Sequence, residues 1–285
     1  NLILKSISVE NFASFAEPII FTTESDLSKK EHLDNTFACG DSRFNKVSFL
    51  YGANGSGKTF FCKILREIQR LLLVSPLAAT PVKTFAFDTS FQEKPTKFAI
   101  ELIIDGTTYR YAFSVKGKEV VYELLTKKHR RTEKLLERTS SSFKDITLRS
   151  DLKGFDAAKH TVKAEALCLP VAGMLNTPLA SKIVAAISGI NVVNMAAGRL
   201  DPVNPKETFS EERLRKYISI IKKADPTLRD IKVSFEEEEV ARQRVSSDDF
   251  ENRELIAKRT KVGVDSRHAV YENGEETTSA PLSFF

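Results

Sequence analysis

The spacing of hydrophobic and polar residues predicts a chain that begins with strands. Residues 1–24 hold two short apolar runs and predict a β-hairpin, whereas residues 25–45 are polar and predict a loop. From about residue 83 to 126, apolar and aromatic residues alternate with polar ones, which is typical of antiparallel strands. Residues 127–155 are charged and serine-rich and predict loops mixed with short strands.

The second half of the chain predicts helices first and strands afterwards. Residues 156–225 have a mostly helical pattern, which prolines divide into short helices. The dividing prolines are Pro170, Pro178, Pro202 and Pro205. Residues 226–285 return to strand-like patterns around a charged loop. The pattern as a whole predicts the α/β fold class.

The segment from residue 46 to 75 changes from a strand-like to a helix-like pattern at a glycine-rich loop. Lys46–Tyr51 predicts a short buried strand, and apolar residues recur at helical spacing from Phe60 to Ile68. The loop between them, GANGSGKT, matches the phosphate-binding pattern G-x-x-x-x-G-K-[ST]. A strand, a glycine loop and a helix in this order are the context that supports the motif.

Each residue type in this loop has a physical reason to be there. Glycines let the backbone wrap a phosphate with its N–H groups pointing inward, and the helix N-terminus adds its positive dipole end. Lys58 is the candidate catalytic residue, because its ammonium group would reach the β- and γ-phosphates. The Thr59 hydroxyl is the candidate Mg²⁺ ligand. The predicted nucleotide-binding residues are Gly52, Ala53, Asn54, Gly55, Ser56, Gly57, Lys58, Thr59 and Phe60.

Composition sets mild limits on the compartment and the partners. The 285 residues are 41% hydrophobic and 28% charged, with a net charge of +5, so an anionic partner is permitted but not demanded. Three cysteines without C-x-x-C spacing, and an N-terminus without a signal-peptide pattern, predict reduced thiols in a cytoplasmic protein. The longest apolar run, residues 183–197, is too short and too polar to predict a membrane span.

The inner residues of the loop, with Asn54 before the middle glycine, resemble the ABC-type P-loop ATPases of the RecF, SMC and OLD group. The start of the chain is similar to the opening strand of that group and its N-F-[basic]-S-[FI] turn, here Asn11–Phe15. Two later segments, Phe98–Phe113 and Ile221–Val233, resemble the bacterial AAA-type ATPases of abortive-infection systems, which defend against phages. The resemblance covers most of the chain loosely, and the P-loop is its most specific part.

Two departures from the family pattern qualify the resemblance. Ala13 stands where the group often has Arg or Lys, so a basic nucleotide or DNA contact at that turn is in doubt. The E-S-x-G-T signature and the Walker B acidic pair of the family do not occur before the last residue, Phe285. We therefore expect this chain to be the N-terminal part of a longer ATPase, whose catalytic acid lies outside it.

The resemblance implies an ABC-type ATPase lobe with an antiparallel β-subsheet and an inserted, mainly helical lobe. On this basis residues 1–155 form the nucleotide-binding αβ lobe, residues 156–225 form the helical lobe, and residues 226–285 are strands returning to the ATPase lobe. ATP with Mg²⁺ is the expected ligand. Guanine is disfavoured because Lys222–Asp225, the nearest match to the [NT]-K-x-D segment of small GTPases, lacks the Asn or Thr.

Three charged segments are open to two interpretations each. Leu102–Asp105 has the apolar-then-acidic pattern of a Walker B strand. However, Asp105-Gly106 lies between two segments in which apolar and polar residues alternate, which favours a hairpin turn. The basic cluster Lys127–Arg131 suits either a nucleic-acid or acidic-protein contact, or a solvated loop, which charge runs usually mark. Glu236–Glu239 favours a mobile connector over a catalytic acidic site.

Two functions follow from the resemblance and stay open at this point. One is an anti-phage ATPase in which two copies or more sandwich ATP, and nucleotide state controls an effector encoded alongside, such as a nuclease or toxin. The other is a RecF- or SMC-like repair ATPase whose ATP-closed dimer clamps duplex DNA. A clamp predicts a basic stripe and steep salt dependence, whereas this chain offers only local basic patches.

Overall fold

The computed structural model describes residues 1–26, 28, 32–53, 57–75, 81–192, 210–247, 250–273 and 275–281. Contacts between Cα atoms divide the chain into two compact units, Asn1–Ile190 and Asn191–Phe285. The predicted division into three regions is a different partition of the chain and stays a prediction.

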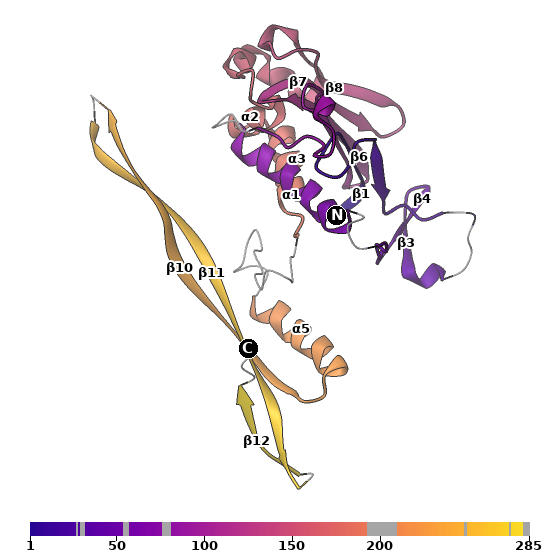
Figure 1. Cartoon of the computed structure of the whole chain (residues 1–285), viewed down its shortest axis with the longest axis vertical. Coiled ribbons are helices and arrows are strands. Elements are labelled where there is room, and N and C mark those ends of the chain that lie inside the picture. The colour runs from indigo at the N-terminus through magenta and orange to yellow at the C-terminus, as the bar shows by residue number, and fades with distance from the viewer. Residues whose placement is uncertain are drawn as a thin grey trace. The chain divides into compact units, whose positions relative to one another are not determined.

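The first unit is built on a seven-stranded sheet in the order β2-β1-β5-β6-β7-β8-β9 (Figure 1). All six neighbouring strand pairs are antiparallel, so the predicted N-terminal hairpin and the antiparallel strands before residue 126 are confirmed. The strands are β1 (Leu2–Glu10), β2 (Ile19–Thr22), β5 (Thr96–Ile104), β6 (Thr107–Lys116), β7 (Glu119–Lys128), β8 (Thr132–Arg138) and β9 (Ile146–Leu148).

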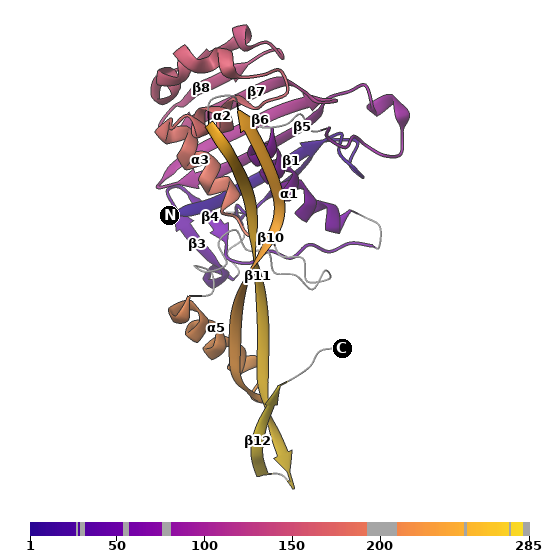
Figure 2. The same cartoon turned by 90° about the vertical axis from the view of Figure 1, so that its left-hand side faces the viewer.

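Helices cover one face of this sheet, as the two views in Figure 1 and Figure 2 agree. The described α-helices of this unit are α1 (Lys58–Val74), α2 (Cys168–Met174) and α3 (Pro178–Ser188), and a longer 3-10 segment, Ser150–Thr161, precedes α2. Three shorter 3-10 helices span Leu33–Asn35, Thr89–Phe91 and Phe143–Asp145. The apolar stripe of α1 and the inward-facing strand residues form the core between sheet and helices.

Helix α2 is fixed to the sheet by a buried carboxylate. Glu123 on β7 is fully buried and accepts hydrogen bonds from the N–H groups of Cys168 and Leu169, at 2.8 and 2.9 Å. The Tyr111 hydroxyl donates to the same carboxylate at 2.7 Å. Burial raises the pKa of Glu123, although these hydrogen bonds act in the opposite direction. Arg138, opposite Glu123 on β8, is also fully buried and donates to the carbonyl oxygens of Ser140 and Ala166.

Two predictions of secondary structure for the residues that precede α1 are wrong. Within the segment predicted as loop, β3 (Thr36–Cys39) and β4 (Ser42–Asn45) form a hairpin whose two-residue turn has Gly40 at φ 58°. This hairpin is stabilised by the fully buried Phe44, whose ring centroid lies 5.8 Å from that of Phe37. The strand predicted at Lys46–Tyr51 is absent, because no described strand pairs with these residues and their side chains are exposed.

The second unit contains helix α5 (Glu211–Ala224) and the three-stranded sheet β10-β11-β12. Its strands are β10 (Leu228–Ser247), β11 (Phe250–Glu272) and β12 (Glu275–Pro281), and their pairs are antiparallel. The prediction of a connector at Glu236–Glu239 is wrong, because these residues lie within β10. The backbone register sets Glu236 opposite Lys261 and Glu238 opposite Arg259. Opposite charges at facing positions favour strand pairing, so an acidic run can extend a hairpin.

Among the described helices, none is by itself long and apolar enough to cross a membrane. Helices α2 and α3 together have the length and composition for a span, but they bend by 111° at the break between them.

Candidate nucleotide-binding site

Helix α1 begins directly after the glycine-rich loop, as the sequence predicted. Gly57 precedes the helix with φ at +92°, a left-handed conformation that favours glycine. A Cβ atom added here would lie 2.8 Å from Phe15 Cζ and 3.1 Å from Ser14 Oγ. The helix start therefore abuts the turn after β1, and only a glycine fits the contact.

Lys58 folds back over the loop from the first turn of α1. Its Nζ atom donates to the carbonyl oxygens of Gly52 and Ala53, at 2.7 and 2.6 Å. The side chain thereby reaches from the start of α1 back to the first two residues of the loop. Asn54, Gly55 and Ser56, the middle of the predicted site, lie outside the described residues.

The next two residues of the predicted site occupy the first turn of α1. Thr59 is exposed, and Phe60 is half-buried with the Nζ atom of Lys63 4.4 Å from its ring centroid. No group of three or more His, Cys, Asp or Glu side chains is placed to hold a metal in the part of the chain that is described. A magnesium site here would resemble those that Mg²⁺ forms with one protein oxygen, phosphate and water.

The turn Asn11–Phe15 contributes two residues that the motif search missed. Ser14 and Phe15 contact Gly57, and the Ser14 Oγ atom is buried with no hydrogen-bond partner among the described residues. The sequence signal for them is the N-F-x-S-F run itself, which carries the family resemblance. Ala13, where the family often has a basic residue, is buried and hydrogen-bonds through its backbone to Thr84 and Ala86.

Asn11 holds this turn in place. It adopts a left-handed backbone conformation with φ at 55°. Its amide nitrogen donates to the carbonyl oxygens of Phe91 and Lys94, both at 3.0 Å, and its Oδ1 atom accepts from the N–H group of Phe85 at 2.9 Å. The turn is thus tied to the loop before β5, which fixes Ser14 and Phe15 against the start of α1.

These residues fit a phosphate-bearing ligand with Mg²⁺. The helix N-terminus presents N–H groups that the helix itself leaves unused, and Lys58, in the first turn, carries an ammonium group that bonds to the loop. Gly57, whose Cβ position is already filled, gives the site a close wall, and the buried Ser14 hydroxyl beside it has no hydrogen-bond partner among the described residues. Such an arrangement can bind polyphosphate and neutralise its charge.

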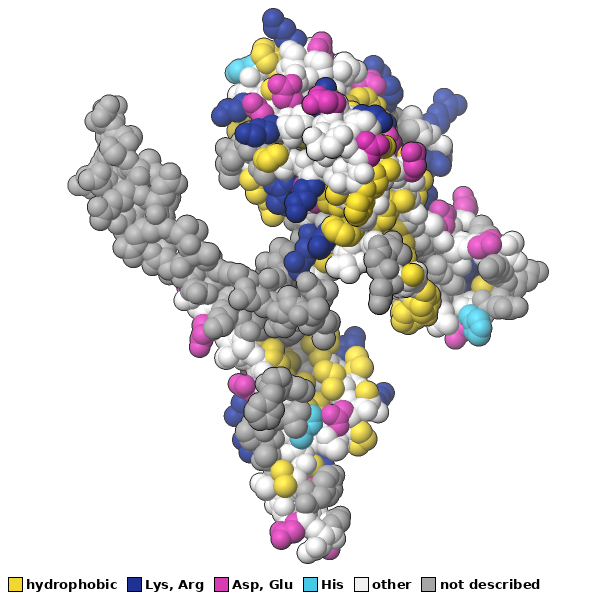
Figure 3. All heavy atoms as spheres, in the orientation of Figure 1, with side chains coloured by type: hydrophobic (Ala, Val, Ile, Leu, Met, Phe, Trp, Pro, Cys, Tyr) yellow, Lys and Arg dark blue, Asp and Glu magenta, His cyan; other side chains and the backbone are white. Residues whose placement is uncertain are grey.

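Exposed apolar side chains adjoin this site. Val47, Phe49, Leu50 and Tyr51 are between 51 and 84% exposed. Figure 3 shows apolar side chains gathered on the surface of the first unit in the region of α1 and the N-terminus. The residues that lead into the P-loop are thus positioned without a described strand beside them.

Two other charged segments lie away from these residues along the chain. Asp105 and Gly106 form the turn between β5 and β6, with φ at 50° and 79°, which confirms the predicted hairpin. The basic cluster Lys127–Arg131 occupies the end of β7 and the turn to β8. Lys127 pairs with Asp151 at 3.0 Å, while His129, Arg130 and Arg131 are exposed.

Comparison with known families agrees with this geometry. A family model described as "AAA domain, putative AbiEii toxin, Type IV TA system" matches residues 47–159, less than half of the chain. The match supports an AAA-type P-loop ATPase family. The matched part begins just before the P-loop and runs through α1 and the sheet strands β5 to β9. No curated protein matches the chain.

Proposed function

We propose that this protein binds and hydrolyses ATP as an ABC-like ATPase of the RecF, SMC and OLD group, in the cytoplasm, as part of a bacterial anti-phage system of the abortive-infection type. The observation that carries the proposal is that Lys58, in the first turn of α1, folds its ammonium group over a loop that matches the phosphate-binding pattern. The family match supports the P-loop assignment, and its description names a toxin of a toxin–antitoxin system.

Each residue of the site would have a separate role in binding ATP and Mg²⁺. Bound Mg²⁺ would supply positive charge next to the phosphates, with Thr59 as its protein ligand. Lys58 would exchange its contacts with the Gly52 and Ala53 carbonyls for contacts with phosphate oxygens. Gly57 would keep the backbone close to the ligand, and the Ser14 hydroxyl, which has no partner in the described part of the chain, would bond to the ligand. Positioning and charge neutralisation are the main needs of phosphoryl transfer.

The first prediction tests the site itself. Lys58→Ala should raise the dissociation constant for Mg-ATP by about 10- to 100-fold, because a hydrogen bond to a charged group is lost. Thr59→Ala should instead raise the Mg²⁺ concentration needed for binding. Calorimetric titration measures both. Lys63→Ala removes the same side chain from the exposed side of α1 and should bind as the wild type does. Equal affinities for wild type and Lys58→Ala would refute the assignment.

The second prediction concerns the partner. We propose that ATP sandwiched between copies of this ATPase controls an effector, such as a nuclease or toxin, and that the effector contacts the basic cluster Lys127–Arg131. Arg130 and Arg131 are exposed on the turn between β7 and β8, so an acidic face could pair with them. The double change Arg130→Glu with Arg131→Glu should release the product of the neighbouring gene in co-purification while Mg-ATP affinity stays unchanged.

A matched reversal on another hairpin controls for net charge. Lys116→Glu with Lys118→Glu, at the turn between β6 and β7, alters the charge equally and should retain the effector. The alternative function, a RecF- or SMC-like clamp on duplex DNA, draws on the same exposed cluster. It would be favoured if the Arg130 and Arg131 variant kept the effector but lost salt-dependent affinity for duplex DNA.

A further inference from the structure

The face of the sheet opposite the helices carries three rows of side chains that the strand register places across β1, β5, β6 and β7. The two outer rows consist of polar residues, and the middle row has small residues on β1, β5 and β6. The first row is Glu10, Lys97, Ser114 and Tyr122; the middle row is Ser8, Ala99, Ala112 and Leu124; the third row is Ser6, Glu101, Arg110 and Thr126.

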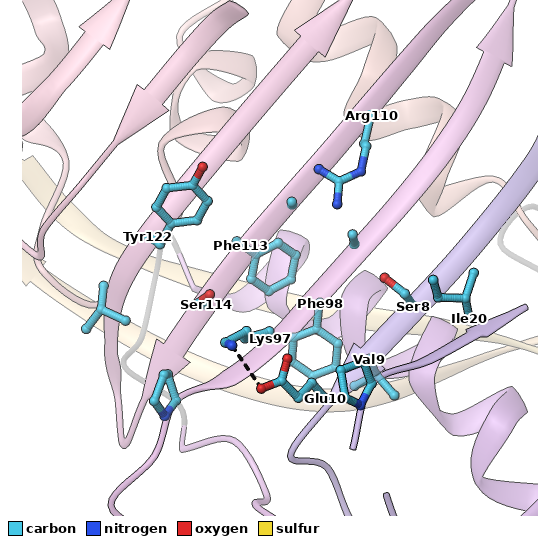
Figure 4. Close-up of a pocket in the computed structure, with 15 residues that line it drawn as sticks. Ser8, Val9, Glu10, Ile20, Lys97, Phe98, Arg110, Phe113, Ser114 and Tyr122 are labelled. Carbon is cyan, nitrogen blue, oxygen red and sulfur yellow. Dashed lines mark hydrogen bonds and ion pairs between the residues drawn. The ribbon is translucent and has the colours of Figure 1, made fainter. Parts of the chain in front are cut away.

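The small middle row makes a hollow in this face. Ser8, Ala99 and Ala112 form its floor, while Ile20 on β2 faces Ser8 at one edge. The hollow has a volume of about 490 Å³ and includes Pro18 and Pro95 at its margin. A volume of this size is in the range of small-molecule sites, and an apolar floor with a few polar groups is their usual lining. Figure 4 shows Tyr122 and Arg110 standing above the sheet around the floor.

A hydroxyl group on the wall of the hollow can bond to a ligand. Ser114 is 7% exposed and lines the hollow, and its hydroxyl has no hydrogen-bond partner among the described residues. Of its neighbours across the strands, Lys97 pairs with Glu10 at 2.8 Å, and Tyr122 makes no hydrogen bond to it. The Ser114 hydroxyl is therefore available to donate a hydrogen bond to an acceptor that enters the hollow.

Among the described charged residues around the hollow, one basic side chain has no ion-pair partner. Glu10 is paired with Lys97, and Glu101 with Lys5 at 3.6 Å and with the Ser6 hydroxyl at 3.4 Å. Arg110 faces Glu101 across the strands yet has no ion pair among the described residues. Figure 4 shows its guanidinium group reaching over the hollow. A guanidinium fork matches carboxylate, sulfonate or phosphate oxygens.

We propose that this hollow binds a small organic anion with a flat apolar body. The body lies on Ala99 and Ala112, the anionic group bonds to Arg110, and an acceptor at the other end takes the hydrogen bond of Ser114. Arg110 and Ser114 are four residues apart on one strand, a Cα separation of about 13 Å, which the Arg110 side chain shortens as it leans inward. A body of two or three rings spans the remainder.

The test uses 8-anilinonaphthalene-1-sulfonate, an aromatic sulfonate, as the probe. The chain contains no tryptophan, so Leu124→Trp places a single reporter at the end of the middle row. In this background, energy transfer from the reporter to the bound dye should saturate at one site. Arg110→Gln should weaken that binding by about tenfold through loss of the charged hydrogen bond.

Variants that fill the floor distinguish dye binding in the hollow from dye binding to the surrounding surface. Ala112→Leu should abolish the saturable energy transfer, and Ala99→Leu on the neighbouring strand should do the same if the first variant folds poorly. Ala38→Leu adds an identical side chain at an exposed position of β3 and should leave the titration unchanged. Lys58→Ala should also leave it unchanged, since the hollow does not include the P-loop.

Three outcomes would overturn the proposal. Unchanged titrations of both floor variants and of Arg110→Gln would show that the dye binds elsewhere. Loss with the floor variants but not with Arg110→Gln would show an apolar hollow that does not select anions. Loss with Arg110→Gln alone would show a surface cation that needs no hollow.

Discussion

Two mainly apolar stretches, each predicted from its pattern to be a strand, have opposite environments in this protein. Phe98–Leu102 in β5 lies between β1 and β6, and Phe98, Ile100 and Leu102 are at most 2% exposed. Val47–Tyr51, just before the P-loop, pairs with no described strand, and Phe49 is 75% exposed. Hydrophobic pattern therefore predicts that a segment can be buried in a sheet. Whether it is buried depends on the strands that pair with it and the helices that cover it.

The largest expected effect concerns the paired region. Glu123→Ala removes the carboxylate that joins β7 to α2, leaving the Cys168 and Leu169 N–H groups and the Tyr111 hydroxyl without their acceptor. Removing one member of a buried charged network costs about 3–5 kcal/mol of unfolding free energy. Urea unfolding of the protein measures this loss. Glu119→Ala, at an exposed position of the same strand, should change stability by less than about 0.5 kcal/mol. Equal effects of the two variants would mean that the Glu123 network does not stabilise the fold.

A smaller effect is expected at the turn between β5 and β6 of the same sheet. The ammonium group of Lys182 on α3 lies 2.8 Å from Asp105, and this contact, with a second from the Asn1 amino group, lowers the pKa of Asp105 to about 2. The folded pKa is below the unfolded value of 3.8, so the contribution to stability is present above pH 3.8 and is lost as the pH falls toward 2. Lys182→Gln should raise the pKa of Asp105 toward 3.8, while Lys182→Arg should keep it low. Carboxyl chemical shifts followed from pH 6 to pH 1.5 distinguish the two, and an unchanged pKa in Lys182→Gln would exclude Lys182 as its cause.

The comparison also explains how far the sequence could predict the molecule. Alternation located β5, β6 and β7, and Asp105-Gly106 gave their turn, because these signals depend on neighbouring residues. The P-loop motif likewise located Gly57 and Lys58 at the start of α1. The β3–β4 hairpin was missed because its one deeply buried aromatic, Phe44, makes too short an apolar signal.

Contacts between distant parts of the chain could not be predicted in this way. Ser14 and Phe15 lie more than forty residues before Gly57, and nothing in their local pattern shows that they meet it. The Glu123–α2 junction joins residues 45 positions apart. The Glu236–Glu239 run by itself predicts a connector, whereas its partners on β11, which are basic residues at three of four facing positions, lie far along the chain from it.

The smallest expected effect lies in the exposed stretch and tests the comparison directly. Phe49→Ala should change the unfolding free energy by less than about 0.5 kcal/mol, because a side chain that is already 75% exposed loses little on truncation. Phe98→Ala is the matched change in the paired strand and should cost about 3–5 kcal/mol, since its ring is 2% exposed and packs against Phe12 and Phe113. The two variants remove the same atoms, so urea unfolding at one protein concentration isolates the effect of environment. A loss above about 1.5 kcal/mol for Phe49→Ala would show that Val47–Tyr51 is covered in the folded protein, and that its apolar pattern predicted burial correctly.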